Sequence, residues 1–318
     1  MDVSKLFHHC LYVKEEDGWF IPMRYTDERV NMYAEKYPAS PYAKSPAGVT
    51  LECITDKDMI SFEFEFESMC GGDYSFSDVI DIWENGEYQY TKFMAFHRGR
   101  FRYVKKNEGK AHICIYLPCA GTLKLKNIDF GDFEEVKMPE NKFLIIGDSI
   151  SQGLFALHPS LALAPRLFRD YGWDYFNSSI GGDYHRDDLI PNELPFEPQK
   201  ILVKLGINDW VFLGDKAVIA KNIELFYESL AKRFPGVPVY VITPCWASNW
   251  DILTDGRPEY TDWVYERIQN VTAAYKNVTI LDGMKIMPKE DICYSDHTHP
   301  SDYGFEWMAK NVADIMFK

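Results

Sequence analysis

The chain has 318 residues, of which 46% are hydrophobic and 15% aromatic, and this length is typical of one large or two ordinary domains. Its 48 acidic and 34 basic residues give a net charge of -14, so the surface should repel phosphate backbones and anionic lipid headgroups. We therefore expect neither nucleic acid nor a membrane as a partner. The composition carries no indication of oligomeric state.

The first residues contain no apolar core of the kind that a signal peptide needs, and no run approaches the roughly 18 apolar residues of a membrane span. The seven cysteines are scattered, odd in number and free of any C-x-x-C pair, which argues against a disulfide framework or a zinc ribbon. These features predict a cytoplasmic chain whose cysteines are free thiols.

The first part of the chain alternates apolar and polar residues with a period of two. The clearest runs are "SFEFEFES" (61–68), "AHICIYLP" (111–118) and "TLKLKNI" (122–128), separated by turn-rich stretches. This pattern is typical of half-buried strands and predicts an N-terminal β-sandwich of the jelly-roll type over residues 1–137. The basic cluster "FHRGRFRYVKK" (96–106) is interpreted as the solvated face of a strand or hairpin in that domain.

Residues 138–318 change to near-continuous apolar strands that alternate with helical segments. The strands are expected at 143–148, 175–180, 200–206, 237–243 and 278–283, and the helices near 152–170, 216–233, 259–275 and 302–317. Apolar strands of this kind are typical of a parallel sheet buried on both faces. The order predicts a doubly wound, flavodoxin-like α/β domain.

Polar residues follow these strands at the points where each strand ends. Ser149 comes after the first strand, Gly182 after the second and Asn208 after the third. Asp296 and His299 share the loop before the last helix. Because the active cleft of a doubly wound sheet lies at the carboxyl ends of its strands, these residues should converge on one edge.

Each residue type has a chemical reason to be there. Ser149 is a weak nucleophile until a base removes its proton, and His299 is the candidate base. Asp296, three residues earlier, can orient the imidazole and stabilise the imidazolium that forms. An attacked carbonyl also needs donors for its developing charge, and the N–H groups of Ser149 and Gly182 and the amide of Asn208 can supply them.

The motifs that hold these residues resemble a known family. "GDSIS" (147–151), "NSSIGGD" (177–183), "GIND" (206–209) and "DHTHP" (296–300) are similar to blocks I, II, III and V of the SGNH hydrolases, or GDSL esterases. All four occur in the family's order, over about residues 143–317. Isoleucine replaces leucine in the nominal GDSL block, a change at an apolar position.

The resemblance implies a role for each matching residue. It implies Ser149 as nucleophile and oxyanion donor, Gly182 and Asn208 as further oxyanion donors, His299 as base and Asp296 as its orienter. Gly182 is preferred to its neighbour Gly181 because it directly precedes an aspartate, as the family's oxyanion glycine does.

Two alternatives concern the same residues. Ser149, taken alone, is also suited to cap the helix that follows it. Asp296, His297 and His299 are of the types that hold a metal, although no companion ligands stand out in the sequence. The complete set of blocks favours the nucleophilic interpretation and no metal.

Possible substrate contacts are less defined. Trp210, Trp246 and Trp250 lie near or just beyond strand ends, where an indole could stack on a sugar ring, and packing in the core is an equal alternative. Asp183 follows the oxyanion turn and is expected to line the substrate side.

The function we predict is a serine esterase that removes a small acyl group, O-acetyl above all, from a carbohydrate through an acyl-enzyme, with no cofactor. A β-sandwich followed by an SGNH domain is similar to carbohydrate esterase family two, which implies an acetylated oligosaccharide, or another small acyl ester, as substrate. The alternatives are a lysophospholipase or thioesterase, and a catalytically inactive carbohydrate-binding protein.

Overall fold

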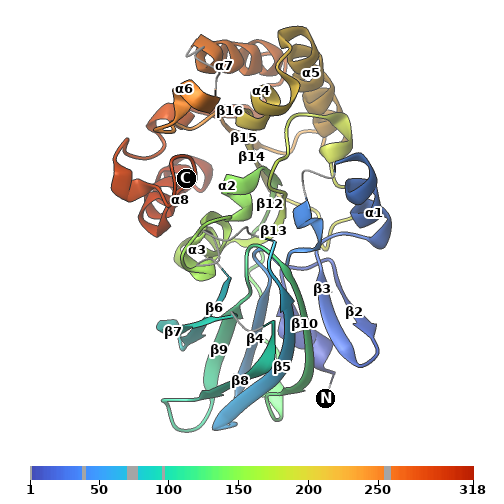
Figure 1. The fold of residues 1–318 in the computed structure, drawn as a ribbon, viewed down its shortest axis with the longest axis vertical. Coiled ribbons are helices and arrows are strands. Elements are labelled where there is room, and N and C mark those ends of the chain that lie inside the picture. Colours follow the sequence, from blue (N-terminus) through green and yellow to red (C-terminus); the bar gives the residue numbers. More distant parts are fainter. Residues whose placement is uncertain (1, 38–40, 70–77, 95–96, 254–258) are drawn as a thin grey trace. The chain divides into compact units, whose positions relative to one another are not determined.

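A computed structural model of the chain describes residues 2–37, 41–69, 78–94, 97–253 and 259–318 (Figure 1). The chain forms two compact units. The first comprises Met1–Pro139 together with Phe155–Ser160, and the second comprises Glu140–Leu154 and Leu161–Lys318. The inclusion of residues 155–160 in the first unit was not anticipated from the sequence.

The first unit contains two antiparallel sheets that share one hydrophobic core. One sheet has the strand order β1-β4-β9-β6-β7, with β11 also paired to β4; the other has the order β2-β3-β10-β5-β8. The strands are β1 (Phe7–His8), β2 (Tyr12–Glu16), β3 (Trp19–Met23), β4 (Thr50–Thr55), β5 (Met59–Glu67), β6 (Val79–Glu84), β7 (Glu87–Phe93), β8 (Arg98–Val104), β9 (Ala111–Tyr116), β10 (Thr122–Asp129) and β11 (Phe133–Glu134). The two sheets confirm the predicted N-terminal β-sandwich, and its jelly-roll type stays a prediction.

Strand β5 shows how the period of two builds the core. Phe62, Phe64 and Phe66 are buried between the sheets, whereas Glu63 and Glu65 point to the opposite face. Burial of each such phenylalanine contributes about 2 to 3 kcal/mol. The alternation of apolar and polar residues in the sequence therefore correctly predicts which side chains enter the core.

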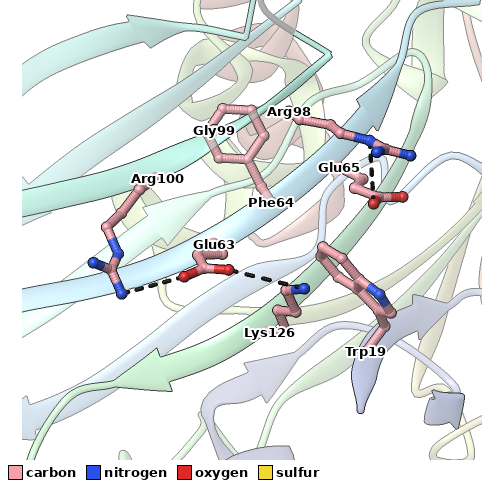
Figure 2. Close-up of a pocket in the computed structure, with 8 residues that line it drawn as sticks. All are labelled: Trp19, Glu63, Phe64, Glu65, Arg98, Gly99, Arg100 and Lys126. Atoms are coloured by element: carbon pink, nitrogen blue, oxygen red, sulfur yellow. Dashed lines mark ion pairs between the residues drawn. The ribbon is translucent and has the colours of Figure 1, made fainter. Parts of the chain in front are cut away.

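The outer face of this sheet carries a ladder of ion pairs (Figure 2). Arg98 and Arg100 of β8 pair with Glu65 and Glu63 of β5 at 3.3 and 3.2 Å, and Lys126 of β10 lies 3.9 Å from Glu63. The two arginine side chains are 80% and 48% exposed. Arg98 and Arg100 of the basic cluster thus lie on the solvated face of a strand, as predicted, whereas Lys105 of the same cluster is buried.

The first unit also contains a helix that the sequence analysis did not predict, α1 (Asp27–Lys36). It begins after Thr26, whose side-chain oxygen accepts a hydrogen bond from the Arg29 N–H at 3.3 Å. Val30 and Tyr33 form its buried face. The local signal is an N-cap followed by two acidic residues, which favour the positive end of a helix dipole.

The second unit is built on a parallel sheet with the order β13-β12-β14-β15-β16. Its strands are β12 (Lys142–Gly147), β13 (Asp174–Ser179), β14 (Lys200–Lys204), β15 (Val239–Ile242) and β16 (Val278–Leu281). In chain order this is the 2-1-3-4-5 arrangement of flavodoxin-like sheets, so the chain reverses direction across the sheet between β12 and β14. The predicted doubly wound sheet is confirmed, and a ligand is expected at this switch point.

Three of the four helices predicted for this unit agree with the structure. α5 (Lys216–Arg233), α7 (Glu259–Thr272) and α8 (Asp302–Met316) fall where expected. The single helix expected at 152–170 is wrong: α2 (Ser149–Gln152) ends after one turn at Gly153, and α3 (Leu163–Tyr171) begins ten residues later. Two further helices, α4 (Ile207–Leu213) and α6 (Trp250–Leu253), follow β14 and β15.

In the part of the chain that the structure describes, no helix combines the length and the apolar character needed to cross a membrane.

Candidate active site

The carboxyl ends of β12, β13 and β14 bring three polar segments to one edge of the second unit's sheet. Ser149 begins α2 with one residue between it and the end of β12, Gly182 lies in the turn after β13, and Asn208 lies in the first turn of α4 after β14. The loop between β16 and α8 supplies Asp296 and His299. These are the positions that a ligand at the β12/β14 switch point would meet.

Three side chains form a hydrogen-bonded relay at this edge. Ser149 Oγ lies 2.9 Å from His299 Nε2, and His299 Nδ1 lies 2.8 Å from Asp296 Oδ2. The helix that follows β12 is capped by Asp148, whose side chain accepts the Ile150 N–H at 3.0 Å. The serine hydroxyl therefore does not serve as the helix cap and is directed to the histidine.

The charge of Asp296 is fixed by its surroundings. Burial alone would raise the pKa of this carboxyl, but hydrogen bonding and charge attraction from His299 outweigh it and, with two backbone N–H groups, lower the pKa to about 2. Those N–H groups are Thr298 N and His299 N, at 2.7 and 2.6 Å from Oδ1. A carboxylate that is ionised at neutral pH can hold the Nδ1–H tautomer of His299, and in that tautomer Nε2 can accept the serine proton.

The loop that carries the histidine is anchored by a second loop after β15. Ser248 Oγ lies 3.0 Å from His297 Nδ1, and Ser248 N donates to the His297 carbonyl at 2.9 Å. Thr298 Oγ1 donates to Asn249 Oδ1 at 3.0 Å. His297 is thus engaged with this loop, and within the described residues no His, Cys, Asp and Glu side chains group together as a metal site.

The turn after β13 distinguishes the two neighbouring glycines. Gly181 N donates to Gln152 Oε1 at 2.6 Å, so its N–H is already engaged. Gly182 has a φ of +90°, a region that favours glycine, and its N–H meets no acceptor among the described residues. This geometry favours Gly182 as the backbone donor of the pair.

The Asn208 amide lies beside the same turn. Its Nδ2 donates one hydrogen to the Asp183 carbonyl at 2.9 Å, and the second hydrogen of the amide group remains for a ligand. Next to it, the Asp209 carboxylate accepts His185 N at 3.2 Å and lies 3.0 Å from His185 Nδ1. Gln152 and the buried His185–Asp209 pair, which sequence reasoning missed, thus hold the turn against α2 and α4.

Two of the predicted substrate contacts are buried, which corrects the sequence-based expectation. The Asp183 side chain is 0% exposed and pairs with Arg186 at 2.8 Å. Trp210 is 6% exposed, and its ring lies 4.8 Å from that of Tyr260. A carboxylate held by an arginine and an indole packed on a tyrosine stabilise the loop and the core, and neither presents a face to a sugar.

The other two tryptophans differ. Trp246 is partly exposed, and its ring meets the edge of Tyr294 with centroids 5.2 Å apart. Trp250 is the first residue of α6, and its side chain lies outside the described part of the structure. Trp246 therefore remains a candidate substrate contact.

Comparison with known families agrees with this geometry. The model of the GDSL-like lipase/acylhydrolase family matches residues 145–307, which is just over half of the chain. The chain belongs to this family and is an SGNH-type hydrolase by fold and motifs. A search of curated protein sequences gives no match.

Solved structures share the architecture over most of the chain. The salicylyl-acyltransferase SsfX3 from a tetracycline biosynthetic pathway is 22% identical, with a TM-score of 0.75 over 98% of this chain and 93% of that one. A family two carbohydrate esterase from Clostridium thermocellum, in complex with cellohexaose, is 16% identical, with a TM-score of 0.64 over 84% and 91%. An acetyl xylan esterase from the rumen bacterium Butyrivibrio proteoclasticus is 16% identical, with a TM-score of 0.58 over 84% and 88%. At these identities the likeness is one of fold.

Proposed function

We propose that the protein is a serine esterase that removes a small acyl group, O-acetyl above all, from a carbohydrate. The observation that carries the proposal is the relay from Ser149 Oγ through the two nitrogens of His299 to Asp296 Oδ2, at 2.9 and 2.8 Å. These distances lie within the hydrogen-bond reach that a nucleophile and its base require.

The reaction would proceed in two halves. His299 Nε2 takes the proton as Ser149 Oγ attacks the ester carbonyl, and the oxyanion is stabilised by the N–H groups of Ser149 and Gly182 and the amide of Asn208. The intermediate collapses as the sugar oxygen leaves with the proton from His299, which gives an acyl-enzyme. Water, deprotonated by His299, then attacks the acyl carbon and releases the acid and Ser149.

The carbohydrate part of the proposal is supported by the neighbours in fold. Two of them are esterases that act on, or were crystallised with, carbohydrates. The partly exposed Trp246 offers an aromatic surface in the loop after β15, whose Ser248 holds the histidine loop.

No cofactor enters this scheme, because serine, histidine and aspartate supply the nucleophile, the base and its orienter. The six cysteines that the structure describes are free thiols, which is typical of a reducing compartment and supports a cytoplasmic setting.

Acetate release from a panel of acetylated oligosaccharides, with the wild type and Ser149→Ala side by side, tests the proposal. We expect release by the wild type alone. Hydrolysis of short- and long-chain nitrophenyl esters should show a preference for acetyl, and a long-chain preference would instead favour a lysophospholipase or thioesterase. No turnover of any ester would favour a binding protein.

A second candidate, acyl transfer to an alcohol, is favoured by the match to an acyltransferase over 98% of this chain. In that case a hydroxyl of an acceptor, rather than water, would attack the acyl-enzyme. Adding an acceptor alcohol to the nitrophenyl acetate assay distinguishes the two: a transferase forms the new ester at the expense of acetate, and an esterase continues to release acetate.

A further inference from the structure

A fully buried ion pair lies directly beside the proposed nucleophile. Lys204 Nζ is 2.7 Å from Asp148 Oδ2, and both side chains are 0% exposed. Lys204 is the last residue of β14 and Asp148 follows β12, two strands that pair in parallel on either side of the switch point. Asp148 immediately precedes Ser149 in the chain.

Lys204 contacts this segment through its backbone as well as its side chain. Its carbonyl accepts the Asp148 N–H at 3.1 Å, and a Cβ on Gly147 would collide with the same carbonyl oxygen. The other oxygen of Asp148 accepts the Ile150 N–H. Asp148, the residue before Ser149, is therefore held at both carboxylate oxygens and at its own N–H. One of these bonds comes from Ile150, the residue after Ser149.

Stability alone gives no reason for a lysine at this place. Ile201, Leu202 and Val203 precede it as 0% exposed residues, so an apolar side chain would continue the strand. Removing two charges from water costs more than their attraction commonly returns, and apolar replacements of buried ion pairs are often neutral or stabilising. Burial alone would lower the pKa of Lys204, but charge attraction and hydrogen bonding from Asp148 help to raise it above its ordinary value.

We propose that Lys204 is a positioning residue for acyl transfer at Ser149. Its charge-assisted hydrogen bond fixes Asp148, which in turn fixes the first turn of α2 with Ser149 Oγ facing His299 Nε2. It also neutralises the carboxylate of the residue that precedes Ser149, whose backbone N–H is a proposed oxyanion donor. This inference rests on the proposed role of Ser149 as the nucleophile.

The test is the rate at which a fluorophosphonate probe labels the full-length protein. In this reaction Ser149 Oγ bonds to phosphorus, fluoride leaves, and His299 takes the serine proton, so the rate reports how well the serine is placed. For Lys204→Met we expect labelling and kcat to fall about 100-fold. KM for nitrophenyl acetate should stay within about threefold, because no substrate contact is removed.

Two further variants control for folding. Asp148→Asn with Lys204→Met leaves no unpaired buried charge and keeps an acceptor for Ile150 N–H, so it should fold; its labelling should still be at least about tenfold slower than wild type. Lys105→Met removes a lysine that is 8% exposed in the first unit, bonded to the carbonyls of Thr55 and Gly109, and should label at the wild-type rate.

The outcomes separate the two proposals. Wild-type labelling rates in the folded double variant would overturn the positioning role and leave the esterase intact. A comparable slowing in Lys105→Met would also overturn it, because loss of any buried lysine would then suffice. Labelling of the wild type that survives Ser149→Ala would overturn the nucleophile, and the positioning role with it.

Discussion

Ion pairs occur in both units of the molecule, but they differ in their surroundings. In the α/β unit, the Asp148–Lys204 ion pair and the hydrogen-bonded Asp209–His185 pair have side chains that are at most 1% exposed. In the β-sandwich, the Glu63–Arg100 pair has side chains that are 32% and 48% exposed. Charge interactions are strong in the first setting and screened in the second, so the same residue types should have very different effects when they are replaced.

The largest effect should come from a residue that carries no charge. Ser149→Ala removes the hydroxyl that is proposed to attack the ester carbonyl. The esterase rate should therefore fall by at least about 10⁵-fold. The melting temperature should stay within about 2 °C of wild type, because no buried charge loses its partner. Nitrophenyl acetate hydrolysis and a thermal melt measure both, and turnover near the wild-type rate would exclude the serine mechanism.

Asp296→Asn should have the next largest effect. The amide cannot hold the imidazole tautomer or stabilise the imidazolium, so kcat should fall by about 10³- to 10⁴-fold. If this variant retained full activity, His299 would be acting without the orienter that the geometry gives it.

The same substitution has a pH signature. The folded-state pKa of Asp296 is depressed to about 2, so the ionised carboxylate stabilises the folded protein. This contribution to the free energy of unfolding is complete above about pH 4 and is lost as the pH falls toward 2. That contribution is about 2 kcal/mol in the wild type and should be missing from the pH dependence of Asp296→Asn. Urea unfolding of both proteins at pH 5, 4 and 3 measures it, and parallel curves would contradict the depressed pKa.

Breaking the His185–Asp209 pair, which holds the turn that contains Gly182, should affect stability more than catalysis. His185→Ala leaves the Asp209 carboxylate buried and removes a ring packed on Phe226 at 5.2 Å, so the free energy of unfolding should fall by about 3 kcal/mol. A shifted turn should lower kcat by about tenfold. Urea unfolding and kinetics measure both changes.

Asp209→Asn is the matched control for that change. It keeps an oxygen that can accept the His185 N–H groups, and it should lose less in both measurements. If it were as damaging as His185→Ala, the negative charge of Asp209, rather than the contact with the histidine, would be the important feature.

The two regions also differ in what their sequences reveal. Strand positions and core faces follow from local alternation, as Phe62 and Glu63 illustrate, and the strand-end rule brings Ser149, Asn208 and His299 to one edge. These features depend on residues near one another in the chain or on a general property of the fold, and they could be predicted.

Features that depend on a distant partner could not be predicted. The burial of Trp210 depends on Tyr260, fifty residues away, and the association of residues 155–160 with the first unit includes two bonds from Ser160 to the Asp81 carboxylate. Lys204 was visible as a charge at the end of an apolar strand, yet only the fold gives it a carboxylate partner. A charge that interrupts a buried strand beside a catalytic motif is the signal to look for.

Changes in the exposed ion-pair ladder of the β-sandwich should give the smallest effect, in contrast to the buried pairs of the α/β unit. A double-mutant cycle with Glu63→Gln and Arg100→Gln should yield a coupling of about 0.2 to 1 kcal/mol, which decreases further in 0.5 M salt because both side chains reach solvent. Esterase activity should be unchanged, since neither residue belongs to the α/β unit. A coupling of several kcal/mol that resists salt would show that the ladder is shielded from water, and the contrast between the two units would then not follow from exposure.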